Sequence, residues 1–253
     1  MPPESDHPEF NTIMREYESL VYSLSYRLTG TFEDAHDLFQ ETMIKAWMNW
    51  DKLENRDRPA GWLRRICTNT FIDLYRKSKI RPGALESDFP LMEAGIMADT
   101  PLPEDELLVD EHIRAVQSQC FTIMTTTLPL NQRIVFVLAH IFDVSLKDTS
   151  VIIDKSIPAT KSLLTRARNS MKDYFGSCCN LVNPENACNC RSWLALQADL
   201  QGKREYIKSL ISQALSADRI TGADREKVLR LFATLPLMMP PPEWFEEFSK
   251  KKD

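Results

Sequence analysis

The sequence predicts an all-α fold, and three observations lead to this prediction. Apolar residues recur at intervals of three and four along most of the chain, as they do on the buried face of a helix. Only seven of the 253 residues are glycine and 43% are apolar, a composition that favours packed helices. Prolines and acidic residues cluster in one central segment. We therefore expect an N-terminal helical domain at 8–80, an acidic linker at 81–110, a helix-turn-helix domain at 111–175 and a small helical extension at 176–253.

The first domain is predicted to contain three helices, at 9–29, 34–49 and 60–78. Gly30 is expected to end the first helix, because glycine is favoured just after a helix C-terminus. The predicted buried residues are Met14, Tyr17, Val21, Leu24 and Leu28 in the first helix, Phe39, Met43, Ala46 and Trp50 in the second, and Trp62, Ile66, Thr70 and Leu74 in the third. Packing of these three faces would form one domain.

The outer faces of the second and third predicted helices carry opposite charges. Asp37 and Glu41 lie one turn apart, and such a like-charge pair costs a few tenths of a kcal/mol. Arg65, Asn69, Asp73 and Arg76 are expected to face outward from the helix at 60–78, with Lys77 and Lys79 at its end. One acidic face and one basic face indicate two different partners.

Charge is also segregated along the whole chain, although the net charge is only −5. Residues 56–81 contain eight Lys or Arg, residues 82–113 contain nine acids and no Lys or Arg, and residues 155–172 contain five basic residues and no acid. This pattern argues against nucleic-acid binding by the whole surface and favours local basic patches. The composition of the acidic segment, residues 82–113, is also typical of a linker that is simply disordered.

The second domain is predicted to contain helices at 107–127, 130–141, 146–153 and 157–174. Ser145 and Asp148 have the spacing of a capping box, and Ser156 is placed to cap the last helix. Pro158 falls in the first turn of that helix, where its missing N–H costs nothing. Asp154 occupies the turn between the last two helices, and Asp tolerates left-handed geometry. A short helix, a tight turn and a longer basic helix are typical of a helix-turn-helix.

Two blocks of the sequence carry recognisable motifs. The first block is DAHDLFQETMIKAW followed by RPAGWLRRICTNTFIDLYRK, and the second is LPLNQRIVFVLAHIFDVSLKDTSVIIDKSIPATKSLLTRAR. Both blocks resemble the bacterial sigma-70 family of RNA polymerase sigma factors, extracytoplasmic-function (ECF) group. Together they span about residues 10–175 in the order that the family has, and the paired match is specific. The resemblance implies sigma region 2 at 8–80, sigma region 4 at 111–175, and a non-enzymatic factor that directs promoter recognition and transcription initiation.

The resemblance also implies roles for individual residues and for partners. The partners would be promoter DNA and the RNA polymerase core, through the clamp helices of its largest subunit and the flap of its second-largest subunit; an anti-sigma factor is a further partner. The residues carried over are Asp37, Gln40 and Glu41 for polymerase, Trp62, Arg64, Arg65, Asn69 and Arg76 for the −10 element, and Lys161, Ser162, Thr165, Arg166 and Arg168 for the −35 element. Phe71 and Tyr75 are further candidates for stacking on melted bases.

Simpler interpretations of the same residues stay open. The acidic face is also what any solvated helix presents, and Trp62 is more often a core residue than a base-stacking one. Pro158, Ala159 and Leu163 depart from the usual family residues, so no −35 sequence preference is carried over. An autonomous helix-turn-helix regulator is the alternative function. An enzyme is disfavoured, since no catalytic motif is present.

Four cysteines, Cys178, Cys179, Cys188 and Cys190, crowd into 13 residues after the second block. They are candidates for a Zn²⁺ site, for a redox-sensing dithiol or for a reduced structural loop, and no cofactor is otherwise expected. Three amphipathic helices are predicted after them, and we expect this extension to regulate the factor in cis. The N-terminus has no apolar signal segment, which predicts a cytoplasmic protein with no membrane partner.

Overall fold

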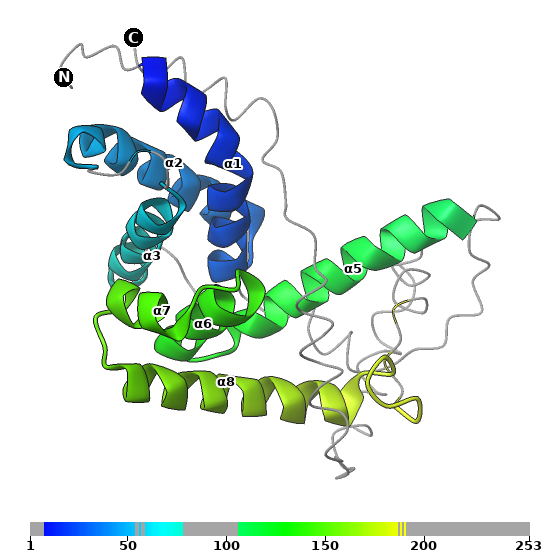
Figure 1. The fold of residues 1–253 in the computed structure, drawn as a ribbon. Coiled ribbons are helices and arrows are strands. Elements are labelled where there is room, and N and C mark those ends of the chain that lie inside the picture. The colour runs from blue at the N-terminus through cyan, green and yellow to red at the C-terminus, as the bar shows by residue number, and fades with distance from the viewer. Residues whose placement is uncertain are drawn as a thin grey trace. The chain divides into compact units, whose positions relative to one another are not determined.

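The computed structural model describes residues 8–53, 56, 59–77, 106–186, 188 and 190. These residues form helices, shown in Figure 1, and one isolated bridge between Cys179 and Cys188, so the all-α prediction is confirmed for the described part of the chain. They belong to two compact units. The first contains the described residues up to 77 together with Thr125–Leu164, and the second contains 106–124 and 165–190. Residues 81–105 of the predicted acidic linker and the helices predicted beyond 190 lie outside these ranges, whereas the last five residues of the predicted linker, 106–110, are helical.

Three helices at the start of the chain pack together as predicted. Helix α1 spans Pro8–Thr29, α2 spans Phe32–Met48 and α3 spans Ala60–Arg76, and each contacts the other two. Gly30 follows α1 with φ of 88°, a left-handed conformation that glycine adopts without strain, and its N–H donates to the carbonyl of Tyr26.

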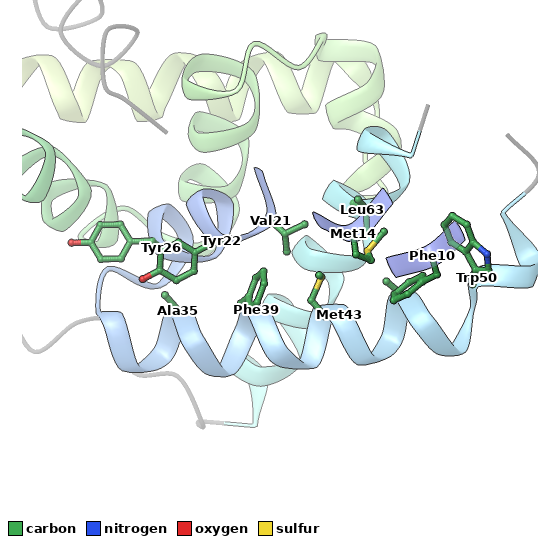
Figure 2. Close-up of a cluster of buried hydrophobic side chains, with 11 residues drawn as sticks. Phe10, Met14, Val21, Tyr22, Tyr26, Ala35, Phe39, Met43, Trp50 and Leu63 are labelled. Atoms are coloured by element: carbon green, nitrogen blue, oxygen red, sulfur yellow. The ribbon is translucent and has the colours of Figure 1, made fainter. Parts of the chain in front are cut away.

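A cluster of buried apolar side chains holds the three helices together (Figure 2). At one end the rings of Phe10 and Trp50 meet edge to face with centroids 5.3 Å apart, and Tyr22 and Phe39 meet in the same way at 6.0 Å. Edge-to-face pairs add to the free energy of area burial. The predicted buried stripe of α2 is confirmed, since Phe39, Met43, Ala46 and Trp50 are all buried.

The prediction for the buried face of α3 is wrong by one position. Leu63, Cys67 and Phe71 are the fully buried residues, whereas Trp62 and Ile66 are only partly buried. Leu74 is also partly buried, and only Thr70 of the predicted stripe is buried. Both sets of positions are apolar, so the periodicity of the sequence did not decide which side of α3 faces the core. Packing against α1 decides it, because the Cys67 sulfur lies 3.6 Å from the Ser25 hydroxyl oxygen.

The segment predicted as the second domain contains four helices close to the predicted ones. Helix α5 spans Glu106–Thr126, and α6 spans Leu130–Phe136 and continues into a π-helical turn at Val137–Ile141. Helix α7 spans Leu146–Ile152, and α8 spans Ile157–Cys178, four residues beyond the predicted end.

The predicted caps and turn of the helix-turn-helix are confirmed. The Ser145 hydroxyl accepts a hydrogen bond of 3.0 Å from the Asp148 N–H and donates one of 2.6 Å to the Asp148 carboxylate. Ser156 accepts from the N–H of Ala159 at 3.3 Å. Asp154 has φ of 52°, the left-handed conformation expected of the turn residue.

Candidate nucleic-acid and protein interfaces

The outer face of α2 begins with acidic and amide side chains. Thr31 caps the helix by accepting from the Asp34 N–H, which fixes where the first turn starts. Asp37 and Glu41 are exposed on the outer face, as predicted. Gln40 is half-buried beside them, with its Nε2 2.8 Å from the Nε2 of His36.

The same face continues with apolar side chains that the sequence analysis did not single out. Ile44 and Met48 follow Asp37 by seven and eleven residues, and they are 42% and 66% exposed. We call Asp37, Glu41, Ile44 and Met48 the α2 stripe. The sequence could have predicted that Ile44 and Met48 are exposed, because their spacing puts them outside the buried stripe of α2. An acidic half followed by an apolar half suits a protein partner better than solvent alone.

The exposed face of α3 is basic and polar. Arg65, Asn69 and Arg76 are exposed and are separated by four and seven residues, so they lie along one side of the helix. We call these three residues the α3 basic face. Asp73 lies on the same side and forms an ion pair of 3.5 Å with Lys45 of α2. Because this pair neutralises Asp73, the net charge of the face stays positive.

The other residues predicted to contact the −10 element are turned toward the helical core. Arg64 is half-buried, and burial lowers its pKa while the nearby Tyr17 acts in the opposite direction. The ring centroids of Trp62 and Trp50 are 6.3 Å apart at the edge of the buried cluster. Phe71 is fully buried, so it is not available for stacking on bases. Tyr75 is half-buried.

The long basic helix α8 presents most of its predicted contact residues to solvent. Lys161, Ser162, Thr165 and Arg166 are exposed, and Arg168 is half-buried. Buried Leu164 and Ala167 mark the opposite side of the helix. An exposed polar and basic helix face after a capped turn has the form of a reader that enters the DNA major groove.

Cys178 is the last residue of α8, and Cys179, Cys188 and Cys190 follow the helix. The Asn180 N–H donates to the Cys188 carbonyl at 2.8 Å, and the Asn186 side chain donates to the carbonyls of Gly176 and Cys179 at 2.9 and 3.1 Å. Burial, followed by the neighbouring Cys179, raises the pKa of Cys190 to about 11. Protonated buried thiols are poor nucleophiles, which argues against a reactive redox dithiol in this conformation.

No three side chains of His, Cys, Asp or Glu are grouped as metal ligands among those that the structure describes. The side chain of Cys178 is not among them, so the four-cysteine Zn²⁺ site stays a prediction.

The fold and the exposed basic helix faces are those of a helical DNA-binding protein. Comparison with known proteins identifies the family. Residues 13–80 match the family described as Sigma-70 region 2, and residues 119–171 match Sigma-70, region 4. The chain belongs to the ECF group of RNA polymerase sigma factors, which are promoter-recognition factors in transcription initiation and not enzymes.

Three of the similar proteins are sigma factors of this group. ECF RNA polymerase sigma factor SigW of Bacillus subtilis is 30% identical over 173 residues, which cover 67% of this chain and 90% of the relative. SigE of Mycolicibacterium smegmatis is 30% identical over 169 residues, 66% of this chain and 62% of the relative. SigG of Mycobacterium tuberculosis is 24% identical over 208 residues, 77% of this chain and 56% of the relative.

None of the described helices combines the length and the apolar character that crossing a bilayer requires.

Proposed function

We propose that this sigma factor distributes its contacts over three helices: α2 binds the RNA polymerase core, α3 binds the melted −10 element and α8 reads the −35 element. The observation that carries the proposal is the separation of an acidic–apolar stripe on α2 from a basic face on α3. Run-off transcription with core polymerase is the direct test. An autonomous regulator would bind promoter DNA without polymerase and would not support run-off synthesis.

The α2 stripe is assigned to the clamp helices of the largest polymerase subunit. Asp37 and Glu41 repel each other in the free protein, and a basic partner would relieve that repulsion. Ile44 and Met48 would provide apolar contact next to the charged one. An anti-sigma factor that competes with polymerase would cover the same stripe.

The α3 basic face is assigned to the single-stranded backbone of the −10 element. Changing Arg65 and Arg76 together to alanine is expected to lower affinity for a single-stranded −10 oligonucleotide about tenfold at physiological salt. The slope of log K against log salt should fall by about 1.4, because each lost single-strand phosphate contact removes about 0.7. Filter binding of the holoenzyme over a salt series measures both. Arg15→Ala, which removes an exposed arginine of α1, is the matched control and should change neither value.

The exposed face of α8 is assigned to duplex DNA at the −35 element. The double variant Lys161→Ala and Arg166→Ala is expected to weaken holoenzyme binding to a −35 duplex and to reduce its salt slope by about 1.8. Lys52→Ala removes a cation outside α8 and should leave the slope unchanged. An unchanged slope in the double variant would show that these side chains do not reach phosphates. The polymerase flap contact is assigned to the same domain, where Val151 of α7 is 56% exposed.

Residues 176–253 are assigned a regulatory role in cis. Phe175 and Val182 are buried, and the ring of Phe175 lies 4.9 Å from that of Phe121, so α8 and the turn after it belong to the packed unit. Truncation after Cys190 therefore tests the extension without cutting into this packing. Run-off transcription by the truncated protein, with and without a chelator, is expected to differ from that of the full chain. Equal activity under all metal and redox conditions would refute the regulatory role.

A further inference from the structure

The first turn of α8 is apolar on its exposed side. The helix begins at Ile157 (Figure 1), and the side chains of Ile157, Pro158 and Ala159 are all exposed. Ile157 is 48% exposed and is among the large apolar side chains that the described part of the chain leaves in solvent. None of these three side chains can form a hydrogen bond with a base edge. Any base readout by this first turn therefore has to be apolar.

The backbone around Ile157 is held in place by local hydrogen bonds. The Ser156 hydroxyl accepts from the Ala159 N–H at 3.3 Å, and the Ser156 carbonyl accepts from the Thr160 N–H at 2.9 Å. Before the helix, the Lys155 N–H donates to the Ser150 carbonyl at 3.0 Å. These bonds fix where α8 begins and in which direction it leaves the turn. The Ile157 side chain therefore starts from a defined position, which discrimination between neighbouring base pairs requires.

Ile157 also continues the face of α8 that is assigned to duplex DNA. Lys161 follows Ile157 by four residues and Ser162 follows Pro158 by four, so each of these pairs lies one turn apart on the same side of the helix. Thr160 is buried and marks the opposite side. When a recognition helix enters the major groove, its N-terminal residues contact the base edges. A helix that brings Lys161 to the groove therefore brings Ile157 to the base edges.

The chemistry of the major groove decides what Ile157 can contact. Base edges present hydrogen-bond donors and acceptors there, and thymine adds one apolar group, its C5-methyl. An exposed isoleucine side chain gains free energy when it leaves water for an apolar surface, and polar base edges do not offer one. The thymine methyl group is therefore the part of duplex DNA that fits this side chain.

We propose that Ile157 determines part of the −35 specificity of this factor by packing against the methyl group of a thymine in the major groove. This inference rests on the proposed function, which assigns the exposed face of α8 to the −35 duplex. The short side chains of Pro158 and Ala159 allow the start of the helix to approach the base pairs closely. Polar and basic residues from Lys161 onward then provide the hydrogen bonds and phosphate contacts.

The test uses holoenzyme formed from core polymerase and the full-length chain, with promoter duplexes that it selects from a pool randomised at the −35 element. Each thymine of a selected element is replaced in turn by deoxyuridine, which pairs with adenine in the same way and lacks only the methyl group. Wild-type holoenzyme should lose about fourfold in affinity at one of these positions, as expected for one methyl group returned to water. Fluorescence anisotropy of labelled duplexes measures the affinities.

Variants of the protein then identify the side chain that contacts the methyl group. Ile157→Ala should bind the thymine and deoxyuridine duplexes equally well, whereas Ile157→Val should retain part of the difference. Circular dichroism checks that both variants fold, as expected for an exposed position. Val151→Ala is the matched control, because Val151 of α7 is another exposed apolar side chain. It should keep the wild-type ratio between the two affinities, whatever its overall affinity.

Two results would overturn the role of Ile157. One is a wild-type holoenzyme that binds every deoxyuridine duplex as tightly as the thymine duplex, or that selects −35 elements without thymine. The other is an Ile157→Ala holoenzyme that keeps the wild-type ratio, since another group would then contact the methyl. Failure of the proposed function is recognised separately. In that case the double variant Lys161→Ala and Arg166→Ala would bind the selected duplex as wild type does.

Discussion

Replacing Asp37 with Asn and Glu41 with Gln is expected to weaken binding to core RNA polymerase by at least about tenfold while slightly stabilising the free protein. The stability gain follows from removing a like-charge pair one turn apart, worth a few tenths of a kcal/mol. The affinity loss follows because removing one partner of a desolvated interfacial charge pair costs about 2–5 kcal/mol. Equilibrium binding of labelled protein to core polymerase and urea denaturation measure the two effects.

Glu16→Gln is the matched control for this double variant. Glu16 is an exposed acid of α1 outside the α2 stripe, so its loss changes net charge without touching the proposed interface. It should leave polymerase affinity within about twofold of wild type. The assignment of α2 fails if the double variant binds polymerase as tightly as this control does. A gain in stability together with a loss of polymerase affinity would identify Asp37 and Glu41 as a functional pair.

Trp50→Ala is expected to have the largest effect on stability. Trp50 is 1% exposed, and its ring packs against Phe10 at 5.3 Å and Trp62 at 6.3 Å. Truncating a buried tryptophan leaves a cavity and costs about 3–5 kcal/mol, a large part of the free energy of unfolding of a small domain. Urea denaturation followed by circular dichroism should show an earlier transition or none.

Met48→Ala, two residues away, is the control for that effect. Met48 is 66% exposed, so its truncation should change the free energy of unfolding by less than about 0.5 kcal/mol. It should instead weaken polymerase binding, because Met48 belongs to the α2 stripe. Similar destabilisation by both variants would contradict the burial pattern of this helix end.

Local sequence determined the helices, caps and turns of the described residues. Helix boundaries at Gly30, Ser145 and Ser156 follow from short-range hydrogen bonding, which involves residues three or four apart. The left-handed turn at Asp154 is equally local. The buried face of α2 was predictable because Phe39, Met43 and Ala46 recur at helical spacing on the side away from Asp37 and Glu41.

Tertiary structure alone decided the features that depend on distant residues. Helix α3 is apolar at two adjacent sets of positions, so only packing against α1 could select Leu63 and Cys67 and turn Trp62 aside. Nothing in the sequence indicated that Arg133 is buried, because a single cation beside an apolar stripe is typical of a solvated side chain. Its partners at Leu28 and Phe71 are 105 and 62 positions away, and no periodic pattern encodes a contact between helix ends that distant in the chain.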